Sequence, residues 1–200
     1  MKVKSKGELT RQTIVDQSLQ LFSVKGYYNT SIKDVLMATG LTKGGLYGHF
    51  SSKEEIWYAV YDQAVDIWRS LVFKGIRQCE DPLERLNSFI RNDMENYLGG
   101  EVFDGGCFFL NMLVELSGQS TSMSKHILRG FVRLSHLLRL WLEEAREKSI
   151  LRPDLNLREI ANFIVITVNG AAALYISSRD RTIIDQTINQ LHGYVENLRA

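Results

Sequence analysis

The side chains best suited to binding a partner at the protein surface are concentrated between Thr42 and Tyr47. Thr42 and Tyr47 offer hydroxyl groups, Lys43 offers a positive charge, and Gly44 and Gly45 leave the backbone uncovered. Two glycines near the start of a helix lower its propensity to form, which is understandable if the backbone must lie close against something such as a groove wall. The first N–H groups of a helix attract anions, and a lysine neutralises phosphate. These residue types therefore favour a polyanion as the partner.

The distribution of charge along the chain points the same way. The 200 residues have a formal net charge of only +1. However, residues 1–53 hold eight Lys or Arg and three acidic residues, whereas the remainder holds 16 basic and 20 acidic residues. A basic head on a mildly acidic body indicates that the head binds the polyanion. Lys2, Lys4 and Lys6 either add phosphate contacts from an N-terminal arm or form a solvated tail.

Other features of the chain exclude several classes of protein. Two cysteines, Cys79 and Cys107, cannot form a disulfide framework and suggest a reducing compartment. The polar N-terminus is unlike a signal peptide, and the most apolar stretch, residues 163–176, is interrupted by polar residues and short for a membrane span. We therefore expect a cytoplasmic protein that has no membrane partner.

No arrangement of residues typical of an enzyme is present. The histidines lack metal-ligand spacing, and the chain has neither a glycine-rich phosphate loop after a strand nor a Ser-His-Asp arrangement. The four histidines are His49, His126, His136 and His192. We therefore expect no enzymatic activity, no cofactor and no metal site.

Helical periodicity and capping residues predict an all-α fold of about nine helices without a sustained strand pattern. Residues 1–52 form a compact three-helix head and residues 53–200 form a larger body. The fourth helix belongs to both parts, and a Ser52–Glu55 capping box starts it. The predicted helices are residues 8–25, 31–39, 42–49, 52–75, 82–99, 106–117, 122–148, 156–178 and 180–198.

The second and third predicted helices form a helix-turn-helix, because a turn containing Gly40 joins them. Val35 faces inward from the first of them, and Leu46 and Phe50 anchor the second on the core. Thr42, with its neighbours up to Tyr47, is left on the outside.

Residues 26–55 resemble the head of the TetR (TetR/AcrR) family of bacterial transcriptional regulators. The family pattern is Gly-aromatic-x-x-Thr-Ser/Thr, then Asp in the second helix, then Ala-Gly-Val-Ser/Thr-Lys-Gly-x-Leu-Tyr-x-His-Phe-x-Ser-Lys-Glu-Glu. This chain has that pattern from Gly26 to Glu55, with mild departures at Thr39 and Leu41. The resemblance is strong over roughly the first sixty residues and elsewhere extends mainly to helix number and length.

The resemblance implies a homodimer that binds a palindromic DNA operator. Bases in the major groove would meet the start of the third helix. Phosphates would meet the later residues of the third helix, Lys53 at the start of the fourth, and the start of the second. Alternatives remain for two residues, since Tyr47 could be a packing residue and His49 a core or capping histidine. The implied DNA-binding residues are Thr30, Ser31, Thr42, Lys43, Gly44, Gly45, Tyr47, His49 and Lys53.

The last two predicted helices have the pattern of a dimer interface. Apolar residues recur every three or four positions, and small residues near Gly170 allow a close approach of helices. Two such helices from each subunit would form a four-helix bundle, as family members do; packing within one chain is the alternative. The predicted dimerisation residues are Ile164, Ala171, Leu174, Ile184, Ile188, Leu191 and Val195.

The middle helices are predicted to enclose a pocket for a small apolar or aromatic effector. Residues 105–115 are almost wholly apolar yet include Asn111 and Glu115, and buried polar groups need partners in the protein or a ligand. Apolar walls with a few polar groups suit such an effector, although ordinary core packing is the alternative. The predicted pocket residues are Trp68, Phe89, Asp93, Tyr97, Phe108, Asn111, Glu115, Leu134 and Tyr175.

Cys107 is a candidate redox residue, because a Gly-Cys at this point is similar to a branch of the family that senses oxidants. A reactive thiol needs a lowered pKa, and no Lys or Arg lies nearby in the sequence. The resulting hypothesis is a ligand-responsive repressor that a small molecule releases from DNA. The alternatives are a thiol-based redox-responsive repressor acting through Cys107 and a regulator-like protein without DNA binding.

Overall fold

The computed structural model describes residues 5–200, so Lys2 and Lys4 lie outside the described part of the chain. Within that part the structure is all-α, as predicted, with nine α-helices and no strand beyond one isolated bridge between Leu151 and Arg199. The helices are α1 (Lys6–Lys25), α2 (Ile32–Thr39), α3 (Lys43–Tyr47), α4 (Lys53–Val72), α5 (Pro82–Arg91), α6 (Phe108–Leu116), α7 (Thr121–Glu147), α8 (Leu157–Ser178) and α9 (Arg181–Glu196). A 3₁₀ turn η1 (Ile76–Gln78) and a π-helical segment η2 (Asn92–Leu98) complete the list.

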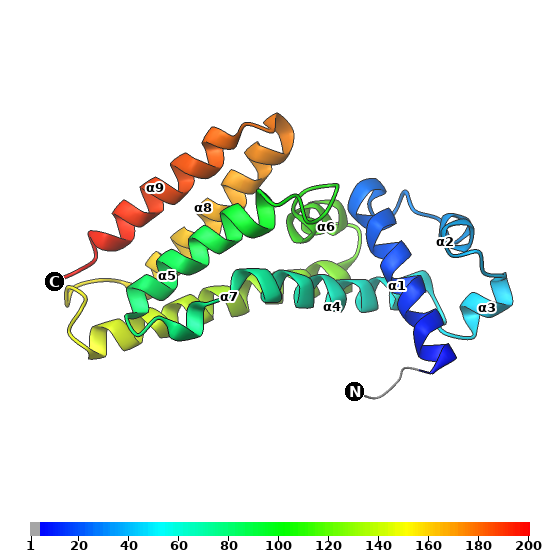
Figure 1. The fold of residues 1–200 in the computed structure, drawn as a ribbon, viewed down its shortest axis with the longest axis horizontal. Coiled ribbons are helices and arrows are strands. Elements are labelled where there is room, and N and C mark those ends of the chain that lie inside the picture. Colours follow the sequence, from blue (N-terminus) through cyan, green and yellow to red (C-terminus); the bar gives the residue numbers. More distant parts are fainter. Residues whose placement is uncertain (1–4) are drawn as a thin grey trace.

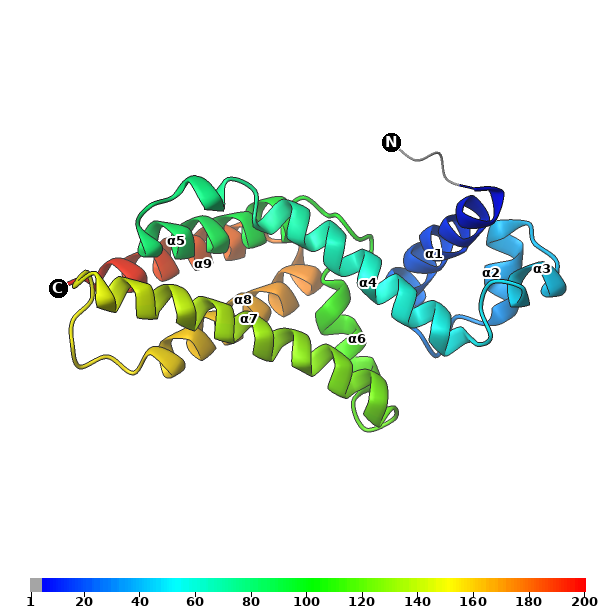
Figure 2. The same ribbon diagram turned by 90° about the horizontal axis from the view of Figure 1, so that it is seen from below.

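The molecule is elongated, with a small helical head at one end and a larger helical body at the other. Helices α1 to α3 form the head, and α4 runs from the head into the body (Figure 1, Figure 2). Phe22 of α1, Leu46 of α3 and Trp57 of α4 are completely or almost completely buried. The first half of α4 therefore belongs to the core of the head, and its second half belongs to the body.

Side-chain caps explain where the helices of the head begin. Ser31 and Asp34 form a complete capping box at the start of α2. The predicted box at α4 is different: Ser52 accepts a hydrogen bond from the Glu55 N–H at 3.1 Å, but the Glu55 carboxylate accepts from Ser51 instead. Glu55 thus stabilises the loop before α4, and the helix starts at the predicted place.

The predicted helix over residues 82–99 changes its winding after Arg91. Asp81 caps α5, and Pro82 occupies its first position, as expected. From Asn92 onward the turns widen to a π-helix, in which the Gly99 N–H donates to the Met94 carbonyl oxygen at 2.9 Å. Such widened turns shift the side-chain register within a helix and often occur at functional sites.

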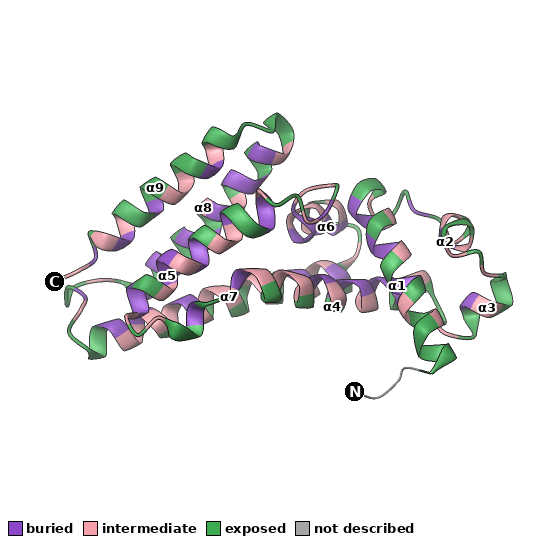
Figure 3. Cartoon of the chain, in the orientation of Figure 1, coloured by how far each residue is buried: buried purple, intermediate pink, exposed green. Residues whose placement is uncertain are grey.

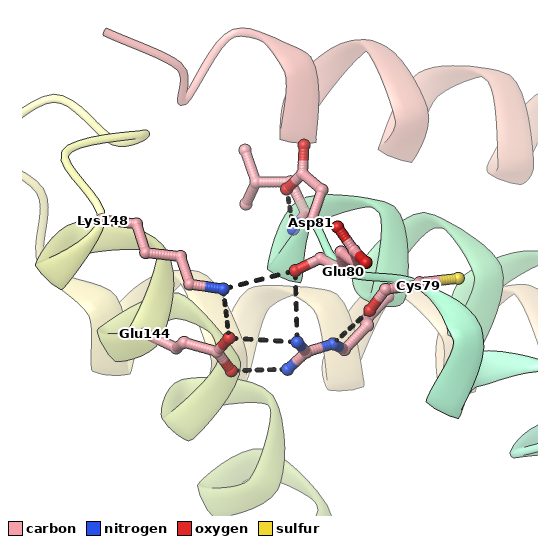
Figure 4. A network of polar contacts seen from close by, with 7 residues as sticks. Cys79, Glu80, Asp81, Glu144 and Lys148 are labelled. Atoms are coloured by element: carbon pink, nitrogen blue, oxygen red, sulfur yellow. Dashed lines mark hydrogen bonds and ion pairs between the residues drawn. The ribbon is translucent and has the colours of Figure 1, made fainter.

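An ionic network joins the start of α5 to the end of α7 (Figure 4), and these helix ends lie far from the head (Figure 2). The Arg85 guanidinium donates to both carboxylate oxygens of Glu144, one of them at 3.0 Å, and Lys148 donates to the same carboxylate at 2.7 Å. These hydrogen bonds, Arg85 first, lower the pKa of Glu144 to about 2. The network fixes this end of the two helices.

Helix α8 is the most apolar of the long helices of the body. Its 22 residues have a mean hydropathy of 1.7 over an 18-residue window, enough by length and composition alone to cross a membrane. The expectation that this region is too short was wrong, because the helix extends beyond residues 163–176. Nevertheless, 44% of the window is buried inside the molecule, and α8 packs against α7 and α9 (Figure 3). A core helix of a helical domain meets the same criterion.

Candidate nucleic-acid interface and internal cavity

Helix α3 lies at the outer end of the head, away from the body (Figure 1). The Thr42 hydroxyl caps it by accepting a hydrogen bond from the Gly45 N–H at 3.2 Å. Lys43 and Gly44 are exposed, and Lys43 forms no ion pair with any other described residue. The Tyr47 side chain is 43% exposed. The start of α3 therefore presents a cation, a hydroxyl and bare backbone to the solvent.

Most of the predicted DNA-binding residues lie at or near the surface of the head. Ser31 is exposed at the start of α2, where its hydroxyl caps the helix. We call the exposed or partly exposed members between residues 31 and 49 the recognition surface. They are Ser31, Thr42, Lys43, Gly44, Gly45, Tyr47 and His49.

The other two predicted DNA contacts, Thr30 and Lys53, are engaged inside the head. Thr30 is fully buried and donates its hydroxyl proton to the Gly26 carbonyl oxygen at 2.7 Å. The Lys53 ammonium donates to the carbonyl oxygens of Tyr27 and Thr30, both at 2.9 Å, and lies 4.1 Å from the centre of the Tyr27 ring. Burial lowers the pKa of Lys53. The burial of Thr30 corrects its assignment as a phosphate contact, whereas Lys53 is partly exposed and its assignment stays a prediction.

Glu115 also has a different place from the one predicted. Its carboxylate accepts hydrogen bonds from the backbone N–H groups of Tyr27 and Tyr28, both at 2.8 Å. Gly26 permits this approach, because a Cβ there would lie 2.7 Å from the carboxylate oxygens, and its φ is +83°. Glu115 therefore ties the end of α6 to the head and does not line the pocket. We call this contact the head–body joint.

A cavity of about 980 Å³ lies in the body, between α4 and α7. Its walls include the aromatic rings of Trp68, Phe73, Phe109, Phe131 and Trp141. The volume is within the range that accommodates drug-sized ligands. Of the predicted pocket residues, the cavity brings together Trp68, Asp93, Tyr97 and Leu134, and Cys107 joins them.

The remaining predicted pocket residues do not line the cavity. Phe89 and Phe108 are buried in the core. The Asn111 amide donates to the Gly105 carbonyl oxygen at 2.7 Å, and the Tyr175 hydroxyl donates to the Glu101 carboxylate at 3.4 Å. Each polar group thus has a protein partner, which the prediction had left open. Lining residues that the prediction missed include Tyr61, Phe109, His126, Phe131 and Trp141.

Two polar pairs lie at the inner wall of the cavity. The Trp68 indole N–H donates to Asp93 Oδ1 at 2.8 Å, and burial raises the pKa of Asp93 to about 6. The Tyr97 hydroxyl donates to the Cys107 sulfur at 3.6 Å, and burial raises the pKa of this thiol to about 11. A protonated, buried thiol is a poor nucleophile, so the structure opposes the redox alternative for Cys107.

The predicted dimerisation residues divide between the core and the surface. Leu174 is 63% exposed and Ile188 is partly exposed. The other five are buried within the same chain, which corrects their assignment to an interface; they are Ile164, Ala171, Ile184, Leu191 and Val195. The exposed apolar side of α8 instead consists of Phe163, Ile166 and Leu174, with Gly170 among them. We call this surface the α8 outer face.

A helix-turn-helix head with an exposed basic α3, joined by α4 to a helical body, defines the architecture of a DNA-binding regulator. Comparison with known proteins leads to the same class of protein. Residues 14–60 match the family model of bacterial regulatory proteins of the tetR family, and residues 82–191 match that of the tetracyclin repressor-like C-terminal domain. The chain therefore belongs to the TetR family and is a transcriptional regulator with a helix-turn-helix DNA-binding head.

Relatives resemble it over nearly the whole chain. The transcriptional repressor DhaR of Mycobacterium sp. (strain GP1) is 28% identical, covering 88% of this chain and 87% of its own. A TetR-family regulator from Cytophaga hutchinsonii is 27% identical with a TM-score of 0.88, covering 100% and 99%. Another, from Chloroflexus aurantiacus, is 27% identical with a TM-score of 0.90, covering 97% and 98%.

Proposed function

We propose that this protein is a repressor that binds a palindromic operator as a homodimer and leaves it when a small molecule occupies the cavity. In this proposal residues 1–52 bind DNA, while residues 53–200 bind the effector and form the dimer. The protein would act in the cytoplasm, where bacterial DNA is found. The relatives' description as repressors supports the direction of regulation.

The recognition surface supports the DNA-binding part of the proposal. Lys43 is unpaired and exposed at the start of α3, beside a glycine whose added Cβ would meet nothing within 4 Å. Phosphate contacts set the register on DNA, while the few base contacts set the sequence read. Because this surface has few base-reading side chains, part of the specificity would come from DNA shape or bridging water.

The observation that carries the regulatory part is that α6 contacts both the cavity and the head. Cys107 and Phe109, at the start of α6, line the cavity. Glu115, near its end, binds the α1–α2 loop. An effector that displaces α6 would therefore move the head relative to its dimer partner. The two recognition helices must lie about 34–36 Å apart to enter successive major grooves, so a change in their separation would lower affinity.

The α8 outer face supports the homodimer. Phe163, Ile166 and Leu174 expose 46%, 70% and 63% of their surface, and the Phe163 ring lies 4.9 Å from the Tyr194 ring of α9. Apolar side chains concentrated on one face of two helices mark interaction sites. A two-fold pairing of α8 and α9 would cover this face.

The test is fluorescence anisotropy of the full chain with its own upstream intergenic DNA and with scrambled DNA, at several salt concentrations. We expect tight, sequence-dependent binding that weakens with salt, and a smaller salt slope for Lys43→Ala because one phosphate contact is lost. Lys33→Ala, which removes an exposed lysine of α2 outside the recognition surface, is the matched control. If the chain binds the intergenic and the scrambled DNA equally, and if selection of DNA ligands from a random-sequence pool yields no preferred sequence, the proposal is refuted.

A further inference from the structure

The charged groups that line the cavity occupy two different environments. Five of them are exposed at its mouth, namely Asp62, Asp66, Arg69, Arg77 and Arg133. A further lining arginine, Arg85, is paired with Glu144. Asp93 is the one acid at the inner wall among the described lining residues, and none of the described Lys, Arg or His residues forms an ion pair with it.

The Asp93 carboxylate is incompletely satisfied by the protein. Oδ1 accepts one hydrogen bond, from the Trp68 indole N–H at 2.8 Å, and no described residue donates to Oδ2. With burial raising its pKa to about 6, the carboxylate is still mainly ionised at pH 7. Asp93 is partly exposed and lines the cavity, so the carboxylate oxygen that accepts no hydrogen bond from the protein is open to a ligand there. Such a group at the wall of a cavity is a candidate binding group.

Aromatic rings of the cavity wall lie around Trp68, the hydrogen-bond partner of Asp93. The Trp68 ring centre lies 6.2 Å from that of Phe109 and 5.5 Å from that of Phe73. Tyr61 extends this cluster, with its ring 5.6 Å from Phe109. Aromatic faces attract cations and bury apolar surface. A single acid among several rings is therefore complementary to a positive charge attached to an apolar body.

We propose that the cavity binds an amphipathic organic cation, such as an arylalkyl amine, with its ammonium group at Asp93 and its apolar part against Trp68 and Phe109. The ammonium would donate to the free Oδ2, and the aromatic rings would face the adjoining carbons. An anion of the same shape would be repelled by Asp93. This assignment rests on the proposed function only in taking the cavity as the effector site.

The experiment measures the affinity of three probes with one skeleton and three charges. Isothermal titration of the full chain at pH 7.5 uses 4-phenylbutylamine, 4-phenylbutan-1-ol and 4-phenylbutyrate. We expect the amine to bind at least ~10-fold more tightly than the alcohol, since a charge-assisted contact exceeds a neutral one by that order. The carboxylate should bind most weakly.

Two variants locate the charge that discriminates among the probes. Asp93→Asn preserves the shape and the acceptor for Trp68 but removes the charge, so the amine and the alcohol should then bind equally while the affinity for the alcohol is unchanged. Asp66→Asn, at the exposed mouth, should leave the preference for the amine intact. Circular dichroism of both variants checks that they fold.

The inference is overturned if the amine binds no better than the alcohol, if it fails to bind at millimolar concentration, or if its advantage survives in Asp93→Asn. These measurements contain no DNA, so they are independent of the operator assay. Amine binding that leaves an operator complex intact would refute the effector role in the proposed function and leave the assignment of the cavity standing. Operator binding without a preference for the amine would refute the assignment of the cavity and leave the DNA-binding part of the proposed function standing.

Discussion

Replacing Glu115 with alanine should loosen the head–body joint. The substitution removes the only acceptor that the described chain provides for the backbone N–H groups of Tyr27 and Tyr28, each 2.8 Å from the carboxylate. Hydrogen bonds to charged groups contribute about 1.5–3 kcal/mol each. Because Glu115 is partly exposed, values at the low end apply, and the pair should contribute about 2–3 kcal/mol in total.

Amide hydrogen exchange measures this loss at the two N–H groups themselves. A change of 2–3 kcal/mol corresponds to roughly 30- to 150-fold faster exchange at Tyr27 and Tyr28. Amides in the middle of α1 and in α8 should keep their protection. Glu147→Ala removes an exposed acid at the end of α7 and is the matched control.

The same variant tests whether the joint transmits the effector signal. With Glu115→Ala, operator binding in the absence of effector should persist, whereas the loss of affinity caused by a saturating effector should shrink. Coupling free energies between two binding sites are typically about 1–3 kcal/mol. The joint contributes a similar amount, so its loss should remove most of the effector's influence on operator affinity. Unchanged exchange at Tyr27 and Tyr28 would refute the account of the joint, and an unchanged effector response would refute its role in transmission.

Three further variants test other parts of the molecule. Gly44→Ala should stabilise the free protein or leave its stability unchanged, because a Cβ there meets nothing within 4 Å. It should nevertheless weaken operator binding if the backbone of α3 lies against DNA. Urea unfolding measures the first effect and fluorescence anisotropy the second, and an unchanged operator affinity would contradict the close approach to DNA. Asp93→Asn should raise the free energy of unfolding at pH 7 by up to about 3 kcal/mol, since burial raises the pKa of this acid to about 6. The folded state then binds more protons than the unfolded one between about pH 4 and 6, so the wild type should lose stability as the pH rises through this range. The variant should lack this pH dependence. If urea unfolding gives the same pH dependence of the free energy of unfolding for both proteins, the assignment is contradicted. Ile166→Arg on the α8 outer face should yield monomers in sedimentation velocity, whereas Val132→Arg, on an equally exposed site of α7, should not; a dimeric Ile166→Arg would move the interface elsewhere.

Local patterns account for the features that could be predicted from the sequence. Ser31 and Asp34 lie three residues apart and cap α2 as expected, and Asp81 and Pro82 start α5. In the same way, the turn at Gly40 and the buried Leu46 define the helix-turn-helix. Each of these features depends on residues within one or two helical turns, where spacing and residue type are sufficient.

Features that depend on tertiary packing could not be predicted in this way. Glu115 and Tyr27 are separated by 88 residues, and nothing in their neighbourhoods indicates that they meet. Helix α8 is apolar on several sides, so its periodicity cannot distinguish the buried Ile164 from the exposed Ile166. The π-helical segment that contains Asp93 and Tyr97 also has no sequence signal, although both residues line the cavity.

The contacts at both ends of α6 explain why this short helix suits the transmission of a signal. Before it, Gly105 packs directly on the last turns of α1, because a Cβ there would lie 1.7 Å from the Ser23 carbonyl oxygen. At its other end, Glu115 binds the α1–α2 loop. Between these two contacts with the head lies Phe109, which lines the cavity. Since packed elements shift between discrete arrangements rather than deform continuously, a ligand that displaces Phe109 would move the end of α1 and the following loop together.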